Sequence, residues 1–269
     1  MCFLCTTCGT QFGPSEQAPG HCSICADERQ YVGPGGQQWT TLAELRATHR
    51  NVIAAEEPGL FSLVTQPKFG IGQRAFVVQS PAGNLLWDCV SLVDSESVAR
   101  VQALGAVAGI AISHPHYYSA MVEWSRALGD VPIFLHQDDA AWVVRPDPCI
   151  VFWQGERRAL WDGLSLVRTG GHFRGYQVLH WPAGADHRGV LLAGDQPFVC
   201  ADRRWVSFMY SYPNLIPLAA PAIRQITASL GNLAFDRLYG AFEGQLVAAD
   251  AQEVVARSAA RYLQAIGTG

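Results

Sequence analysis

Two histidines one residue apart, His114 and His116, follow an apolar run at 107–112 and are the first candidate metal ligands. The run is typical of a buried strand, and the residues from Ser119 onward begin a helical pattern. Side chains two positions apart in an extended segment point the same way, so both imidazoles can reach one ion. Neutral imidazole is a frequent ligand of zinc and iron. Taken alone, the pair is explained equally well as two polar loop residues without a joint role.

Two further candidate ligands stand where later apolar segments end. His172 lies in a Gly-Gly-His turn at 170–172, and Asp195 directly follows the apolar run 190–194. Each places a potential ligand at the end of an apolar strand or in a glycine-bounded turn, which makes a joint role for the histidine pair more plausible than the pair alone does.

The order strand, His-x-His, strand, Gly-His-x-x-Gly, strand, Gly-Asp resembles the metallo-β-lactamase superfamily from about residue 60 to the C-terminus. The resemblance implies that His114, His116, His172 and Asp195 bind one metal ion. It also implies an α+β fold of the αββα sandwich type, the metallo-β-lactamase fold. In that fold two mixed β-sheets lie face to face, flanked by helices, with the metal site at one edge.

The family has a second metal position beside the first, and the chain departs from the family pattern at the ligands of that second position. The family motif His-x-His-x-Asp-His is His-Pro-His-Tyr-Tyr-Ser here, so Tyr118 and Ser119 replace an aspartate and a histidine. The turn that carries the family's final histidine corresponds to 239–244, which contains no histidine. We therefore expect one ion at this site. In the family the replaced aspartate orients the nucleophile, whereas a neutral tyrosine is a poor base but a usable hydrogen-bond donor.

The resemblance implies a mononuclear metal-dependent hydrolase of a small ester, thioester, lactone or amide, with a metal-bound water as the nucleophile. The catalytic candidates are Tyr118 and Asp195. Zinc is the first candidate for the ion, with iron and manganese as alternatives. Two other functions stay open. One is a degenerate metal-binding or protein-interaction domain without hydrolase activity, and the other is a mononuclear iron oxygenase that resembles the persulfide dioxygenases.

A segment rich in aromatic residues and arginine, 202–213, follows the aspartate and is a candidate substrate-binding region. Aromatic side chains would give a substrate flat apolar walls, and an arginine would bind a carboxylate or phosphate. The substrate-binding candidates are Tyr117, Arg204, Trp205 and Tyr210. The alternative is a surface loop that packs on the core, with its arginines paired to acids.

Four cysteines near the N-terminus form a separate metal-binding pattern, Cys5-x2-Cys8 followed by Cys22-x2-Cys25. Four thiolates satisfy tetrahedral zinc and leave no open coordination position, so a structural zinc ion is predicted. Gly9 suits the left-handed backbone that such a turn requires. The spacing resembles a zinc ribbon. The alternative is two disulfides, which are rare in a cytosolic chain.

Other residues near the cysteine pattern could also serve as ligands of this ion. Cys2 also forms a Cys-x2-Cys pair with Cys5, and His21 is a weaker substitute ligand. Few large apolar residues surround the pattern, so metal binding is expected to supply most of the folding energy. We predict a zinc-ribbon-like module over 1–38 and a metallo-β-lactamase-like domain over 39–269.

The composition and charge of the chain disfavour nucleic acids and membranes as partners. The 269 residues are 49% hydrophobic and 16% charged, with a net charge of −4 and a pI near 6.0. A nucleic-acid binder would normally carry a basic field. We find neither a run long enough to cross a membrane nor a signal-peptide pattern. The expectation is a cytoplasmic protein that binds a small-molecule substrate without nucleic acid or membrane partners, with homodimerisation as an open option.

Periodicity and turn residues predict the elements that position these groups. A Thr-x-x-Glu capping box at 41–44 predicts a short helix through 47. His136, at the end of a strand, is expected to be a hydrogen-bonded core residue, and His180 is assigned no metal role. The remaining predicted elements are strands at 60–65, 75–79, 85–88, 132–135, 149–152, 164–167 and 235–239, and helices at 94–104, 119–128, 138–143, 221–230 and 249–266.

Overall fold

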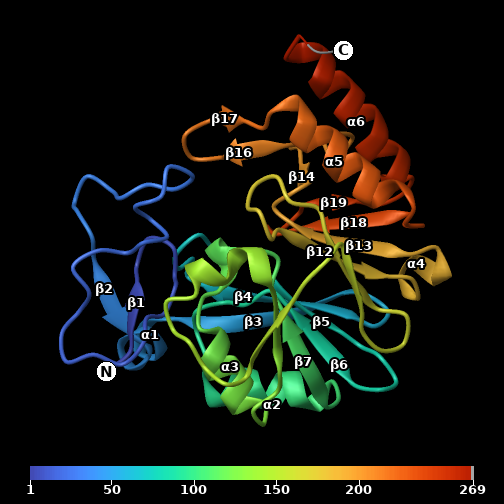
Figure 1. The fold of residues 1–269 in the computed structure, drawn as a ribbon. Coiled ribbons are helices and arrows are strands. Elements are labelled where there is room, and N and C mark those ends of the chain that lie inside the picture. Colours follow the sequence, from blue (N-terminus) through green and yellow to red (C-terminus); the bar gives the residue numbers. More distant parts are fainter. Residues whose placement is uncertain (268–269) are drawn as a thin grey trace. The chain divides into compact units, whose positions relative to one another are not determined.

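A computed structural model describes residues 1–267 of the chain, and Figure 1 shows its helices and strands. The contacts divide the chain into two units, each of which is described by itself. The first comprises Met1–Leu135 with Ala140–Phe152, and the second comprises His136–Asp139 with the residues from Trp153 on. Each unit is built around one mixed sheet with its own helices.

A seven-stranded mixed sheet forms the core of the first unit, with the strands in chain order from β3 to β9. β3 to β6 pair as antiparallel neighbours, whereas β7 is parallel to both β6 and β8. The strands are β3 (Arg50–Glu57), β4 (Leu60–Gln66), β5 (Ala75–Val78), β6 (Asn84–Trp87), β7 (Val107–Ala111), β8 (Ile133–His136) and β9 (Ile150–Trp153).

Two helices of the first unit follow β6 and the His-x-His loop. α2 (Ser95–Ala103) is capped by Asp94, whose carboxylate accepts the N–H of Ser97. α3 (Met121–Ala127) begins shortly after the His-x-His loop, and both helices contact the sheet (Figure 1). The predicted helices at 94–104 and 119–128 are confirmed, each shorter by one or two residues at either end, because helix ends fray or tighten.

The N-terminal segment packs on the first sheet's unit. β1 (Phe3–Cys5) pairs with β2 (Trp39–Thr41), and α1 (Leu42–Thr48) begins with the predicted capping box between Thr41 and Glu44. The β1–β2 pairing crosses the boundary predicted after residue 38, and the boundary itself stays a prediction. The four cysteines share an apolar cluster with Phe12, Trp39, Ile71 and Trp142.

A six-stranded mixed sheet forms the core of the second unit, in the order β10-β11-β12-β13-β18-β19. β13 is wholly buried and is parallel to β18, and the other neighbours are antiparallel. The strands are β10 (Arg157–Ala159), β11 (Ser165–Arg168), β12 (Gln177–Trp181), β13 (Val190–Gly194), β18 (Arg237–Gly240) and β19 (Leu246–Val247).

Two long helices cover this second sheet. α5 (Ala220–Gly231) and α6 (Ala251–Ala265) pack against each other, and both contact the sheet (Figure 1). α5 has Pro221 in its first turn, as predicted. The buried residues of α6 include Val254, Val255 and Ala259, which lie on one side of the helix.

Two short hairpins lie in and around the aromatic segment 202–213. β14 (Phe198–Val199) pairs with β15 (Val206–Ser207), and β16 (Met209–Ser211) pairs with β17 (Ile216–Pro217). Strands this short carry too little periodicity to be predicted. None of the described helices combines the length and the apolar content that a membrane crossing requires.

Candidate metal centres

The His-x-His segment follows β7 directly. His114 is extended, with φ −168° and ψ 170°, and precedes a 3₁₀ turn at Pro115–Tyr117 that contains His116. The expectation that both histidines lie in one extended segment is therefore wrong, because proline favours the first position of a helical turn. The two rings nevertheless lie together, with centroids 5.0 Å apart, and they are 1% and 2% exposed.

A carboxylate holds the first of these imidazoles through a serine. Asp88, just after β6, accepts hydrogen bonds from the N–H and the hydroxyl of Ser113 at 2.7 and 2.8 Å. The Ser113 Oγ lies 2.9 Å from Nδ1 of His114. Because the hydroxyl of Ser113 donates to Asp88, its Oγ accepts a hydrogen bond from the N–H at Nδ1, which leaves the lone pair of His114 on Nε2.

Asp88→Ala is therefore expected to lower the free energy of unfolding by about 1–3 kcal/mol, since it leaves the buried N–H of Ser113 without its acceptor. It is also expected to weaken metal binding by roughly 10-fold or more. Asp88→Asn is the matched control, because it keeps an acceptor and tolerates the local φ of 58°. Denaturant unfolding and titration in metal buffers measure the two effects. Equal unfolding free energies and equal metal affinities of Asp88→Ala and Asp88→Asn would contradict the role given to the side chain of Asp88.

The second unit contributes His172 and Asp195. Nδ1 of His172 donates to the carbonyl of Met209 at 3.2 Å, and its Nε2 lies 4.0 Å from Oδ2 of Asp195. The hydroxyl of Tyr176 accepts the N–H of Asp195 at 2.9 Å and lies 3.2 Å from its Oδ1. These contacts fix the orientation of the imidazole and of the carboxylate.

The turn that presents His172 depends on glycine. Gly171 has a φ of 89°, and a Cβ on it would lie 2.6 Å from the amide nitrogen of Gln196. That amide accepts the N–H of His172 at 3.0 Å and donates to the carbonyl of Gly170 at 2.7 Å. Gln196 and Tyr176 were missed by the sequence analysis, although Gln196 directly follows the predicted aspartate.

The four predicted ligands form one group. One ligand atom of each of His114, His116, His172 and Asp195 lies within 4.8 Å of the others, and each side chain is buried. Three imidazoles and a carboxylate suit a divalent metal with nitrogen and oxygen ligands. Because Nδ1 of His114 and of His172 is already hydrogen-bonded, their Nε2 atoms are the ones available to an ion. The residues therefore fit a metal ion.

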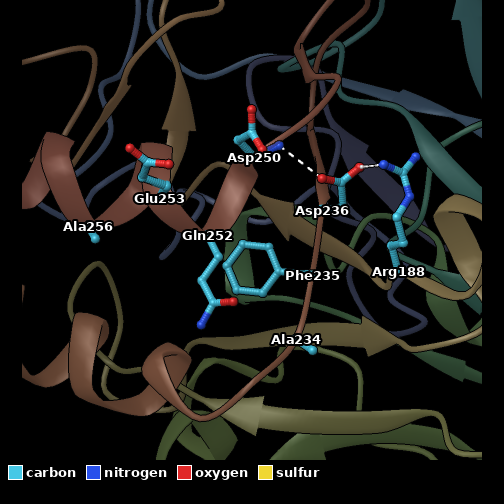
Figure 2. A pocket seen from close by; sticks show the side chains of 8 residues that line it. All are labelled: Arg188, Ala234, Phe235, Asp236, Asp250, Gln252, Glu253 and Ala256. Atoms are coloured by element: carbon cyan, nitrogen blue, oxygen red, sulfur yellow. Dashed lines mark hydrogen bonds and ion pairs between the residues drawn. The ribbon is translucent and has the colours of Figure 1, made fainter.

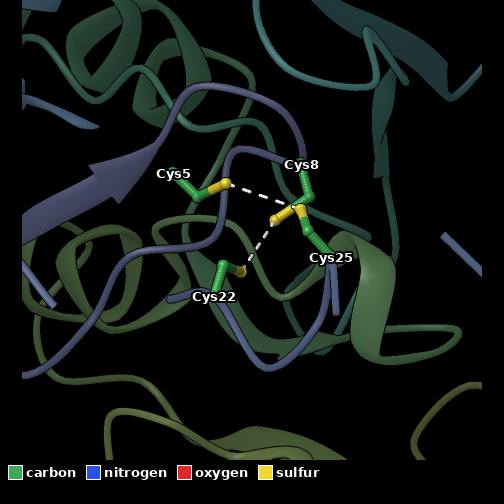
Figure 3. A group of neighbouring side chains, drawn as sticks. All are labelled: Cys5, Cys8, Cys22 and Cys25. Atoms are coloured by element: carbon green, nitrogen blue, oxygen red, sulfur yellow. Dashed lines mark hydrogen bonds between the residues drawn. The ribbon is translucent and has the colours of Figure 1, made fainter. Parts of the chain in front are cut away.

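The four N-terminal cysteines form the second group that can hold an ion, as Figure 3 shows. The Sγ atoms of Cys5 and Cys25 lie 3.5 Å apart, and those of Cys8 and Cys22 lie 3.7 Å apart. All four cysteines are free thiols and are buried. The predicted register is confirmed, since Cys2 and His21 lie outside the group and Gly9 has a φ of 84°.

Hydrogen bonds among the four cysteines shift their pKa values in opposite directions. The contacts with Cys22, Cys25 and Cys8 hold the pKa of Cys5 well below its ordinary value, and the pKa of Cys22 is also lowered. The same network raises the pKa of Cys8 and of Cys25. The side-chain amide of Gln37 also donates to Sγ of Cys5 at 3.1 Å. Donors to a ligand sulfur are typical of the outer shell of a metal site.

The residues that replace the family's second-position ligands pack against the N-terminal segment. Tyr118 is 2% exposed and lines a cavity of about 10 Å³ that also includes Gln11 and Arg145. The carbonyl of Ser119 accepts the N–H of Gln11 at 3.0 Å, and its hydroxyl accepts a hydrogen bond from Gln73 at 2.9 Å. A cavity of this size admits no more than one water molecule. The catalytic role of Tyr118 stays a prediction.

The predicted substrate-binding residues lie in different settings. Tyr117 is fully buried, with its ring 4.3 Å from that of His114. Arg204 pairs with Asp202 at 3.3 Å, and its side chain is 77% exposed. The ion pair of Arg204 favours the alternative of a surface loop whose arginines pair with acids. The substrate role of Tyr117 and Arg204 stays a prediction.

Trp205 and Tyr210 complete the predicted substrate-binding set. The guanidinium groups of Arg257 and Arg261, both on α6, lie 5.1 and 3.7 Å from the ring centroid of Trp205. This cation–π contact favours a packing role for the tryptophan. Tyr210 lies in β16 and is partly buried. The substrate role of both residues stays a prediction.

Two other buried histidines, His136 and His180, are hydrogen-bonded to backbone carbonyls, as predicted for His136. Nε2 of His136 lies 3.0 Å from the carbonyl of Gly155, and Nε2 of His180 lies 2.8 Å from that of Ala234. Burial lowers the pKa of both imidazoles, which favours their neutral forms.

A surface hollow on the second unit holds none of the predicted site residues. It lies beside the start of α6, and Figure 2 shows Asp236 in contact with Arg188 and with Asp250. Asp236 pairs with Arg188 at 3.1 Å and accepts the backbone N–H of Asp250 at 3.0 Å.

Comparison with solved structures shows the fold. The chain superposes on the metallo-β-lactamase VMB-1 with a TM-score of 0.60 at 11% identity, over 81% of this chain and 99% of that one. It matches the metallo-β-lactamase DIM-1 with a TM-score of 0.59 at 13% identity, over 80% and 98%. A metallo-β-lactamase of Cronobacter sakazakii gives 0.53 at 17% identity, over 83% and 96%. This protein therefore has the metallo-β-lactamase fold, of the predicted αββα class.

A sequence relative defines the family more narrowly. The chain is 47% identical over 268 residues to the uncharacterized protein YmaE of Bacillus subtilis (strain 168), covering 99% of this chain and 97% of the relative. The chain belongs to the same family as YmaE. No protein-family profile matches it. The match extends across the N-terminal cysteines as well as the sheets.

Proposed function

We propose that the protein is a mononuclear metal-dependent hydrolase of a small ester, thioester, lactone or amide substrate. The observation that carries the proposal is the buried group of three imidazoles and one carboxylate. A divalent ion held by such a group supplies a water molecule whose pKa falls to about 7. Zinc is the first candidate because imidazole and carboxylate are among its usual ligands.

The chain's own residues prepare these ligands. Ser113 and the carbonyl of Met209 bind Nδ1 of His114 and of His172, which keeps each Nε2 unprotonated. Tyr176 holds the aspartate through its backbone N–H. Burial keeps competing water from the ligands and strengthens their electrostatic attraction for a cation.

The contacts of Tyr118 and Ser119, which replace the family's ligands of a second ion, support a single ion at the His/Asp group. Ser119 is hydrogen-bonded to Gln11 and Gln73, and Tyr118 faces a small closed cavity. Neither residue type is a usual ligand of zinc. We therefore propose one ion at the His/Asp group and a second, structural zinc ion at the cysteine group.

The test is a combined measurement of metal content and hydrolysis on the full chain. We expect two ions per chain and turnover of model esters, thioesters or lactones that a chelator abolishes and added metal restores. Full occupancy without hydrolysis of any of these substrate classes would contradict the proposed activity. Bound iron, with oxygen uptake on persulfides, would indicate the oxygenase instead.

A non-catalytic binding protein is the second candidate function. The observation that favours it is the contact of Ser119 and Tyr118 with the N-terminal segment, since these positions carry metal ligands in the family that the chain resembles. This candidate expects an ion at the cysteine group, a vacant or inert His/Asp group, and no hydrolysis. The measurement above distinguishes the two.

A further inference from the structure

The cysteine segment contacts the loop that carries the paired histidines. The N–H of Gln11 donates to the carbonyl of Ser119 at 3.0 Å, and the hydroxyl of Ser91 donates to the carbonyl of Gly9 at 2.8 Å. Gly70 approaches so closely that a Cβ on it would lie 3.0 Å from the backbone nitrogen of Gly9. All these residues belong to the first unit. The cysteine segment is thus packed against the candidate site's own loop.

The residues after Cys25 form a turn that is held by hydrogen bonds and a cation–π contact. The guanidinium of Arg29 makes two hydrogen bonds to the carboxylate of Asp27, at 2.5 and 2.9 Å, and lies 5.0 Å from the ring centroid of Trp142. The N–H of Gln30 donates to the carbonyl of Asp27 at 3.0 Å. This turn fixes the direction in which Gln30 leaves the cysteine segment.

The side chain of Gln30 reaches a predicted metal ligand. Its amide nitrogen lies 3.4 Å from Nδ1 of His116, and the residue is 8% exposed. The two ends of a glutamine amide have the same shape, so either can face the ring. Gln30 and His116 are 86 positions apart in the sequence.

We propose that Gln30 is a positioning residue of the His/Asp metal centre, acting through His116, and that the cysteine module is thereby an integral part of that centre. The inference rests on the proposed function only in requiring an ion at the His/Asp group. A polar partner on a ligating imidazole fixes the ring's orientation and its proton, and losing such a partner typically weakens metal binding by roughly 10–100-fold.

The test compares three variants of the full chain with the structural ion retained at the cysteines. Gln30→Leu removes the polar contact at similar volume, Gln30→Glu keeps an acceptor for the ring, and Gln17→Leu changes an exposed glutamine of the same segment. Co²⁺ is titrated into the emptied His/Asp site in metal buffers, and its visible absorption is recorded. Thermal unfolding of each variant checks the fold.

We expect Gln30→Leu to weaken Co²⁺ binding by about 10-fold or more with unchanged band intensities, while Gln30→Glu and Gln17→Leu stay near the parent. Equal affinity of the parent and Gln30→Leu overturns the inference and leaves the hydrolase proposal standing. A changed coordination spectrum in Gln30→Leu also overturns it, in favour of direct ligation by Gln30. If the parent binds no Co²⁺ beyond the cysteines, both proposals fail.

Discussion

Replacing Asp195 or His114 by alanine is expected to remove the ion of the His/Asp group and any hydrolysis together. Each residue is buried and supplies one ligand atom of the group. Loss of an outer-shell partner already weakens metal binding by about 10–100-fold, so loss of a ligand is expected to weaken it by more than about 100-fold. Metal analysis after equilibrium dialysis and the ester, thioester and lactone assays measure the two losses.

The controls are acids and imidazoles of the same chain that lie outside the group. Asp202→Ala removes an acid that pairs with Arg204 at the surface, and His21→Ala removes an exposed histidine. Both are expected to keep two ions and full activity. Unchanged metal content in both Asp195→Ala and His114→Ala would remove the basis of the functional assignment.

Replacing Cys22 and Cys25 together by serine is expected to release the structural ion and unfold the cysteine segment. Zinc binding at such sites contributes apparent free energies of about 10–16 kcal/mol at neutral pH, and the segment's apolar cluster is built largely from the four cysteines themselves. Limited proteolysis is expected to cut within residues 1–38, and the metal content is expected to fall. Mass spectrometry of the fragments locates the cuts.

Cys2→Ser is the matched control for this double variant. Cys2 is a free thiol outside the group, so its replacement is expected to change neither the metal content nor the protease resistance. Metal loss in Cys2→Ser would show that the register assigned to the cysteines is wrong. Protease resistance of the double variant in the absence of metal would contradict the structural role of the ion.

The two expected results are linked through the proposed contact of Gln30 with His116. If the cysteine segment positions His116, its unfolding is expected to weaken the His/Asp centre too, although the four cysteines form a separate group of ligands. In the double cysteine variant the ion at the His/Asp group is then more weakly held than in the parent. The same metal buffers measure this second effect.

Much of the architecture follows from short-range patterns in the sequence. The Thr41–Glu44 capping box, the apolar run that becomes β7 and the proline that opens α5 depend on residues within one or two turns of each other. The Cys-x2-Cys pairs are equally local, since each places two thiols by a single turn. Such features were predicted because their causes lie within a few residues.

What the sequence by itself determined is therefore the class of fold and the identity of the candidate ligands. The tertiary structure alone decided how those ligands are held. Asp88 and Ser113 are 25 positions apart, Tyr176 and Asp195 are 19 apart, and Gln30 and His116 are 86 apart. Their contacts exist because the sheets bring distant segments together, and no periodicity of the sequence records which distant polar side chains will meet.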